Sequence, residues 1–120
     1  MKESGEMYLE TILVVGKKKE YVRAIDVVEE MGYSKPSVSR AMSKLKADGD
    51  IEVDVNGHIK LTKKGYEIAS KIFERHQVIS EMLIRLGVSE KVAREDACKM
   101  EHDISDETFE VIKRHSRFGE

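Results

Sequence analysis

The sequence predicts a mainly α-helical fold that contains one short β-hairpin near its middle. Apolar residues recur at helical spacing along most of the chain, and Pro36 is the only proline, so little in the sequence interrupts a helix. Residues 51–61 differ, because apolar and polar residues alternate there on both sides of Asn56-Gly57. Such alternation is the period of a strand, and an Asn-Gly pair is typical of a hairpin turn.

Three helices are predicted before the hairpin. The first ends at Gly16 and the polar run from Lys17 to Glu20, and the second extends from about residue 23 to residue 31. Ser34 is a favourable N-cap residue for the third helix, which ends before Asp48-Gly49. Helix, helix, turn, helix and hairpin follow one another as in a winged helix-turn-helix, so we expect a DNA-binding domain of this kind in residues 1–65.

The part of the chain after the hairpin is predicted to be entirely helical. A long helix is expected from Lys63 to Leu86, a second from Ser89 to His102, and a third from Ser105 to His115. We therefore expect residues 66–120 to form a helical domain. The apolar residues between Ile68 and Val92 exceed what one small lobe needs to cover itself, which predicts a homodimer interface.

Composition sets limits on the class of protein. The chain has 120 residues, a net charge of −2, 40% hydrophobic and 37% charged residues, which suits one compact domain or two small lobes. No apolar run is long enough to span a bilayer and the N-terminus has no signal-peptide pattern, so we expect a cytoplasmic protein without a membrane partner. Cys98 is the only cysteine, which excludes an intrachain disulfide.

Charge is distributed unevenly between the second and third predicted helices. The second carries three acidic residues, whereas the third carries basic residues and no acidic one, as expected of a helix that approaches DNA. Arg40 is long enough to reach a guanine edge, and Pro36 could contact a thymine methyl group. His58 in the wing could also meet phosphate. The alternative is an ordinary solvated helix, because helix-turn-helix folds also occur in proteins that never bind DNA. The candidate DNA-contact residues are Ser34, Lys35, Pro36, Ser37, Ser39, Arg40, Lys44 and Lys60.

A second group of residues has the chemistry of a metal site. Cys98, Glu101 and His102 are spaced i, i+3, i+4, which places a thiol, a carboxylate and an imidazole on one face of a helix. The alternative is that Cys98 is a core thiol and the other two side chains are solvated. Met7 and Glu10 share a face of the first helix, and His76 lies in a part of the long helix expected to be partly buried. Met7 and His76 could equally be structural residues.

The sequence resembles the diphtheria toxin repressor and manganese transport regulator family of metal-activated repressors. The resemblance covers nearly the whole chain and implies a homodimeric repressor of metal-homeostasis genes that binds palindromic double-stranded operator DNA. The resemblance implies a short form of the family, without the SH3-like third domain. The segments that carry it are Glu6-Met7-Tyr8-Leu9-Glu10, Ser34-Lys35-Pro36-Ser37-Val38-Ser39, Leu61-Thr62-Lys63-Lys64-Gly65, Arg75-His76, and Glu95 to His102 followed by Ser105-Asp106.

The resemblance also implies ligand roles. Met7, Cys98, Glu101 and His102 match the primary metal site of the iron-responsive branch. Glu10 and His76 match ligands of the two-metal site in the manganese-responsive branch. In that branch Met7 would be an aspartate and Cys98 a glutamate, so this chain combines features of both.

Two departures concern the ancillary metal site of the iron branch. Ser80 stands where that branch has a carboxylate, and Arg94 stands where it has a histidine, so a complete ancillary site is not expected. A second metal ion held by Glu10 and His76, with Glu101 as a ligand shared by both ions, is an alternative that the sequence leaves open.

The sulfur ligands decide which metal is predicted. The thioether of Met7 and the thiolate of Cys98 favour Fe(II) over Mn(II), and Co(II), Ni(II) or Zn(II) are expected to substitute in vitro. The sequence therefore predicts an iron-responsive repressor. A manganese-responsive repressor is the first alternative because of Glu10, and a metal-independent winged-helix regulator is the second. We do not expect an enzyme, because the sequence offers no nucleophile–base pair and no Gly-rich phosphate loop.

Overall fold

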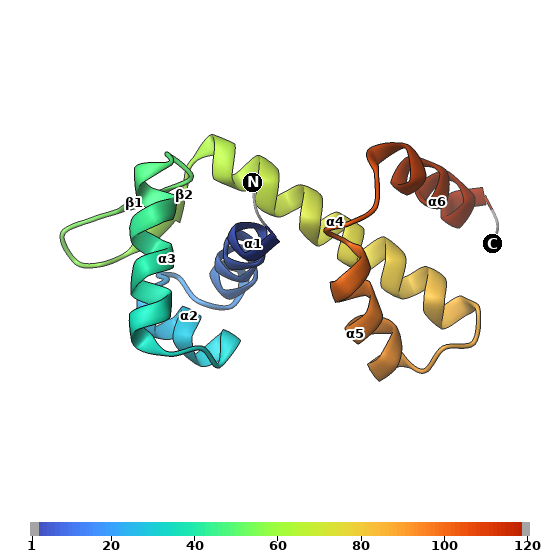
Figure 1. The fold of residues 1–120 in the computed structure, drawn as a ribbon, viewed down its shortest axis with the longest axis horizontal. Coiled ribbons are helices and arrows are strands. Elements are labelled where there is room, and N and C mark those ends of the chain that lie inside the picture. Colours follow the sequence, from blue (N-terminus) through green and yellow to red (C-terminus); the bar gives the residue numbers. More distant parts are fainter. Residues whose placement is uncertain (1–2, 119–120) are drawn as a thin grey trace. The chain divides into compact units, whose positions relative to one another are not determined.

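The fold is mainly α-helical with one small antiparallel sheet, which confirms the predicted class. The computed structural model describes residues 3–118. The chain divides into two compact units, residues 1–70 (the N-terminal unit) and residues 71–120 (the C-terminal unit), with the boundary inside one helix. The elements, labelled in Figure 1, are α1 (Glu3–Lys18), α2 (Ala24–Met31), α3 (Lys35–Ala47), β1 (Ile51–Val53), β2 (Ile59–Leu61), α4 (Lys63–Arg85), α5 (Glu90–Met100) and α6 (Asp106–Phe118).

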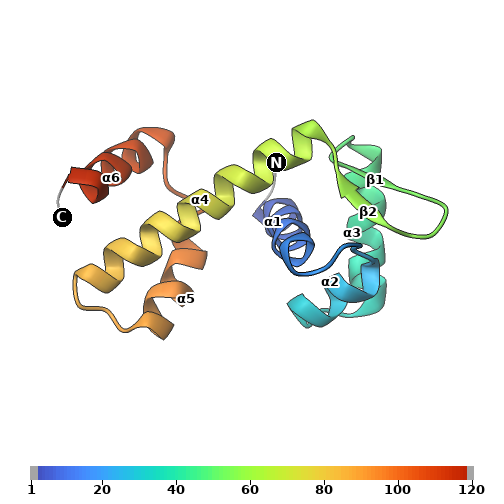
Figure 2. The ribbon, with the colours of Figure 1, turned by 180° about the vertical axis from the view of Figure 1, so that it is seen from behind.

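The N-terminal unit is a winged helix-turn-helix. α1 packs against α2, α3 and β2, and α3 also contacts β1. The views from both sides show the loop of the β1–β2 hairpin extending away from the helices as a wing (Figures 1 and 2). Leu9, Val27 and Val38, one from each of the three helices, are fully buried, so the apolar faces read from the sequence meet in one core.

The turn between α2 and α3 follows the local chemistry of the sequence. Gly32 ends α2 in the left-handed conformation, with φ of 72°, and its amide donates to the Val28 carbonyl. The Ser34 hydroxyl then caps α3 by accepting a hydrogen bond from the Ser37 amide at 3.3 Å. These caps fix both ends of the turn and confirm the predicted start of α3.

The hairpin differs from a two-residue Asn-Gly turn. β1 and β2 pair Ile51 with Leu61 and Val53 with Ile59, which leaves a loop of residues 54–58. Gly57 has φ of 78°, but Asn56 has no positive φ, so these two residues do not form a type I′ turn. Asp54 explains the difference, because its carboxylate accepts hydrogen bonds from the amides of Asn56 and His58.

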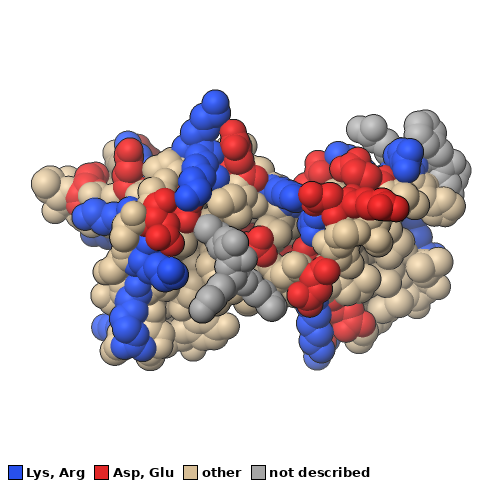
Figure 3. Space-filling view, turned by 45° about the horizontal axis from the view of Figure 1, so that its top comes forward, with Lys and Arg blue, Asp and Glu red and all other residues tan. Residues whose placement is uncertain are grey.

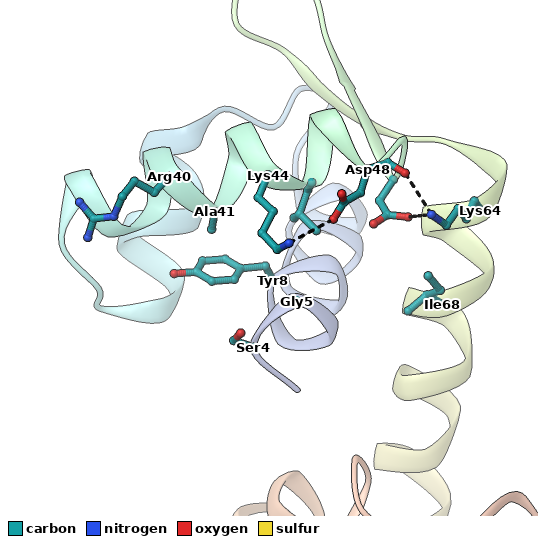
Figure 4. A pocket seen from close by; sticks show the side chains of 11 residues that line it. Ser4, Gly5, Tyr8, Arg40, Ala41, Lys44, Asp48, Lys64 and Ile68 are labelled. Carbon is teal, nitrogen blue, oxygen red and sulfur yellow. Dashed lines mark hydrogen bonds and ion pairs between the residues drawn. The ribbon is translucent and has the colours of Figure 1, made fainter. Parts of the chain in front are cut away.

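The connection from the wing into α4 is closely packed. The Thr62 hydroxyl accepts from the Gly65 amide at 3.1 Å and donates to the Gly49 carbonyl at 2.7 Å. A Cβ atom at Gly65 would lie 2.0 Å from the Asp50 carbonyl oxygen, so only glycine fits there. Lys64 bonds the Asp48 carbonyl at 3.0 Å and pairs with the buried Asp50 carboxylate at 3.3 Å (Figure 4). The end of α3 is thereby tied to the start of α4.

The C-terminal unit consists of the second part of α4 with α5 and α6. Ile79, Ala93 and Ala97 are fully buried. The Ser89 hydroxyl caps α5, as predicted, but α5 ends at Met100, two residues before the predicted end at His102. None of the helices in residues 3–118 combines the length and apolar character that crossing a membrane requires.

Candidate metal centre and DNA-recognition surface

The C-terminal unit brings together three of the predicted metal ligands. His76 lies in α4, and Glu101 and His102 follow directly after α5. Nδ1 of His76 lies 2.8 Å from Oε2 of Glu101, and Nε2 of His102 lies 3.4 Å from Oε1 of the same carboxylate. One carboxylate therefore stands between two imidazoles, one from a neighbour in sequence and one from another helix.

The burial of Glu101 makes this cluster unusual. Its side chain is fully buried, and within the described part of the chain Oε1 has no hydrogen-bond partner. Such a buried carboxylate oxygen is costly unless a cation or a donor satisfies it. Because imidazole and carboxylate groups are ligands of divalent first-row transition metals, the cluster fits the metal ion that the family resemblance implies.

An ionised Glu101 determines how His76 is oriented. An ionised carboxylate only accepts hydrogen bonds, so Nδ1 of His76 is the donor in this contact. The imidazole is held by the carboxylate in the same manner as in many metal-binding histidines.

Three further predicted ligands lie in α5 and α1. Cys98 lies in α5, one helical turn before Glu101 and His102, and its thiol is partly buried. Met7 and Glu10 lie three residues apart in α1 of the N-terminal unit, and both are partly buried. The ligand roles of these three residues, like those of His76, Glu101 and His102, stay predictions.

Arg75 is a residue of this region to which the sequence analysis gave no role. Its guanidinium group is buried and donates to the carbonyl oxygens of Glu101 at 3.1 Å and Ile104 at 2.8 Å. It also pairs with Asp106. The resemblance to the known repressors includes Arg75-His76 and Ser105-Asp106, which is the only signal in the sequence that pointed to these contacts.

Asp106 joins two basic residues of α4. Lys71 lies 2.8 Å from its carboxylate, and Arg75 contacts the same oxygen. The hydrogen bond from Lys71, together with the positive charge of Lys71, lowers the pKa of Asp106 below its ordinary value. The first turn of α6 is thus attached to α4 by two cations.

The predicted DNA-contact residues of α3 are on its surface. Ser34, Lys35, Pro36, Ser39, Arg40 and Lys44 are exposed and Ser37 is partly exposed, whereas Val38, Met42 and Leu45 on the opposite side are buried. Ser34 also caps the helix, and its hydroxyl donates to the Ser37 hydroxyl oxygen at 2.9 Å. The exposed side of α3 is therefore available to a polyanion, although its DNA contacts stay predictions.

The base of the wing holds a cluster around His58. The imidazole stacks on Tyr21 with ring centroids 4.3 Å apart, and its Nε2 lies 3.0 Å from a guanidinium nitrogen of Arg23. Because a guanidinium group only donates, Nε2 of His58 is the acceptor. His58 thus helps to fix the wing, whereas the exposed Lys60 on β2 keeps its predicted role of meeting phosphate.

A pocket of about 650 Å³ lies within the N-terminal unit. Figure 4 shows Tyr8 of α1 under α3, with Arg40 and Lys44 on α3 and Lys64 on α4. Burial raises the pKa of the Tyr8 hydroxyl, Tyr33 adds to this shift and Arg40 opposes it. Arg40 and Lys44 thus stand at the border between this pocket and the exposed side of α3.

Basic side chains do not form one uniform patch on the face drawn in Figure 3. Lysine and arginine residues lie beside aspartate and glutamate residues there. Lys44 itself is 3.7 Å from Asp48, and Lys18 and Lys19 pair with Glu30 and Asp26. On this face the charges of the two signs are mixed, so contacts to DNA there would depend on individual residues rather than on a strong local field.

A winged helix-turn-helix followed by a helical unit with a buried carboxylate between imidazoles defines a class of DNA-binding regulators with a metal site. Residues 1–59 match the model of the N-terminal DNA-binding domain of iron-dependent repressors, and residues 62–119 match the model of their metal-binding and dimerisation domain. The chain therefore belongs to this family of metal-dependent transcriptional repressors.

Individual relatives support the same assignment. The chain is 34% identical to the transcriptional regulator MntR of Escherichia coli, over 88% of this chain and 68% of that protein. It is 35% identical to an HTH-type transcriptional regulator of Methanocaldococcus jannaschii, over 94% of this chain and 92% of that protein. It superimposes on the solved structure of the manganese regulator SloR with a TM-score of 0.84 and 28% identity, over 95% of this chain. The chain spans about half of the length of that structure, 54%.

Proposed function

We propose that this chain is a metal-activated repressor that binds palindromic operator DNA as a homodimer and responds to Fe(II). The observation that carries the proposal is the buried Glu101 carboxylate between His76 and His102, with one oxygen that lacks a hydrogen-bond donor in the described residues. Family membership supports the roles in DNA binding, metal binding and dimerisation.

The ligands that the family resemblance implies are proposed to hold the metal. Met7, Cys98, Glu101 and His102 would hold a primary ion, and Glu10 with His76 would contribute to a second. When bound, a divalent ion supplies positive charge and directional coordination bonds for these side chains. Met7 and Glu10 would then restrain α1, and α1 packs against the recognition helix α3. Metal affinity and DNA affinity are coupled reciprocally, typically by about 1–3 kcal/mol.

The exposed residues of α3 and Lys60 of the wing are proposed to contact the operator. Ser34, Lys35, Ser37, Ser39, Lys44 and Lys60 would bind phosphate, Arg40 would reach a base edge, and Pro36 would contact a thymine methyl group. In a homodimer two such helices meet successive major grooves, which requires half-sites separated by about one helical turn of DNA or a multiple of it.

Fe(II) is preferred because two of the proposed ligands are sulfur atoms. Thiolate and thioether ligands favour Fe(II) and its substitute Co(II), whereas Mn(II) prefers oxygen. Mn(II) is the second candidate, because Glu10 offers a further carboxylate and the similar structure SloR is a manganese regulator. A thiolate must be deprotonated to bind, so metal affinity should fall as the pH is lowered.

The test is DNA binding measured with a chelator and then with single metals. DNA fragments bound by this chain are selected from a random pool in the presence of Fe(II) under anaerobic conditions. Binding to the selected DNA is then titrated with Fe(II), Mn(II), Co(II), Ni(II) and Zn(II). We expect the chelator to abolish binding and Fe(II) or Co(II) to restore it at lower concentration than Mn(II). Binding that ignores the chelator would instead favour a metal-independent regulator.

A further inference from the structure

Arg75 is an unusual residue for the interior of a small helical unit. Its side chain is 5% exposed, and its guanidinium carbon lies 5.2 Å from the centre of the Phe109 ring. A buried cation is costly unless its donors are satisfied; here Nη1 donates to two carbonyl oxygens and Nη2 to the Asp106 carboxylate, and Nε has no partner among the described residues. The contacts therefore form a built site for an arginine rather than an accidental contact.

The two carbonyl oxygens belong to the turn that follows α5. Glu101 is the C-cap residue of α5, and Ile104 lies three residues later. A helix leaves its last carbonyl groups without amide partners, and here one nitrogen of Arg75 donates to both oxygens. The carbonyl of Glu101, just beyond the end of α5, therefore accepts from Arg75 rather than from an amide of a further helical turn.

Two consecutive residues of α4, Arg75 and His76, contact the main chain and the side chain of Glu101, respectively. Arg75 binds its main-chain carbonyl at 3.1 Å, and His76 contacts its carboxylate at 2.8 Å. The orientation of a carboxylate depends on where its main chain is fixed, and residues behind a metal ligand commonly set this orientation.

We propose that Arg75 is a positioning residue of the metal centre, whose guanidinium fixes the main chain of Glu101 so that the carboxylate faces His76 and His102. This inference rests on the proposed function, because it assumes that Glu101 binds the metal. Lysine cannot replace arginine in this role, since an ammonium group lacks the planar fork that reaches two carbonyl oxygens and a carboxylate together.

The experiment compares Arg75→Lys with Asp106→Asn in the full chain, using Co(II) as the probe. Both substitutions disturb the attachment of α6, but only Arg75→Lys releases the carbonyl of Glu101. We expect Arg75→Lys to lower Co(II) affinity by roughly 10–100-fold and to change the visible absorption bands of bound Co(II). Asp106→Asn should lower the melting temperature in chelator while leaving the Co(II) spectrum as in the wild type.

Each outcome bears on a separate statement. A wild-type Co(II) affinity and spectrum in Arg75→Lys would overturn the role of Arg75, and so would equal changes of affinity and spectrum in both variants. If circular dichroism shows that Arg75→Lys is unfolded in chelator, the same measurements are made on Arg75→Gln, which leaves no buried charge. If neither variant folds, Arg75 is a structural residue and the inference fails. Failure of the wild-type chain to bind Co(II) would overturn the proposed function itself.

Discussion

Nδ1 of His76 lies 2.8 Å from Oε2 of Glu101, although 25 residues separate them in the sequence. The contact joins α4 to the turn after α5, and it positions an imidazole against a carboxylate that is fully buried. His76 is therefore linked to the Glu101–His102 pair within the C-terminal unit, and substitutions in this group should act on metal binding together.

Replacement of Glu101 by glutamine is expected to abolish most metal binding while preserving the fold. The amide keeps the shape of the side chain, but it removes the negative charge that a divalent cation requires. Co(II) affinity should fall by more than the roughly 10–100-fold that is typical of residues behind a ligand. Stability to urea in chelator should stay equal or rise, because a buried charge is lost. Glu95→Gln, an exposed change of the same kind in α5, is the control.

The identity of the preferred metal is expected to depend on Met7 and Cys98. Met7→Asp combined with Cys98→Glu should shift activation of DNA binding from Fe(II) toward Mn(II), because both sulfur ligands become oxygen ligands. Anaerobic titration of DNA binding with each metal measures the shift. The wild-type Co(II) complex should show a sulfur-to-metal charge-transfer band that Cys98→Ser lacks. Persistence of the band in Cys98→Ser would remove Cys98 from the ligand set.

Arg40→Ala is expected to weaken DNA binding without unfolding the protein. The side chain is exposed and donates a long hydrogen bond of 3.4 Å to the Ser37 hydroxyl, so its loss leaves the core of α3 intact. A base-reading arginine is worth about 1–3 kcal/mol of binding free energy. Lys46→Ala removes a charge from an exposed position of the same helix and serves as the control in a salt titration. Equal losses in both variants would mean that Arg40 contributes only charge.

Gly65→Ala is expected to destabilise the N-terminal unit strongly. The added methyl group would lie 2.0 Å from the Asp50 carbonyl oxygen, and neither backbone segment can move without breaking the contacts of Thr62. The cost should reach at least the upper part of the roughly 1–3 kcal/mol range for overpacking. Gly16→Ala in α1 is the control, since its Cβ would meet only a Val22 methyl at 3.8 Å and helix propensity favours alanine by roughly 0.5–1 kcal/mol. Urea unfolding compares the two.

Asp26→Asn is expected to remove a pH-dependent contribution to stability. The hydrogen bond from Lys19, followed by that from the Arg23 amide, lowers the pKa of Asp26 below its ordinary value of 3.8. A carboxyl group with a depressed folded-state pKa stabilises the fold above its unfolded pKa, and this contribution is lost as the pH falls through the folded value. The stability difference between wild type and variant should therefore be constant near neutrality and vanish in acid. Glu29→Gln, an exposed change on the same helix, should show no such difference.

Local features of the sequence were sufficient to predict most of the secondary structure. Ser34 and Ser89 cap their helices as predicted, because a hydroxyl beside free amides acts within a few residues. The loop of the wing was less predictable, since Asp54 competes with Asn56-Gly57 for the geometry of the turn. α1 ends at Lys18, inside the polar run that was predicted to end it.

The sequence by itself determined the order of elements, the apolar faces of the helices and the chemical kinds of the candidate ligands, because all of these follow from residue type and periodicity. Only the tertiary structure decided that His76 contacts Glu101, that Arg75 holds the turn after α5, and that Gly65 lies against Asp50. These contacts join residues far apart in the chain. They depend on how helices pack and on which buried polar groups must find partners, and neither property is encoded in local periodicity.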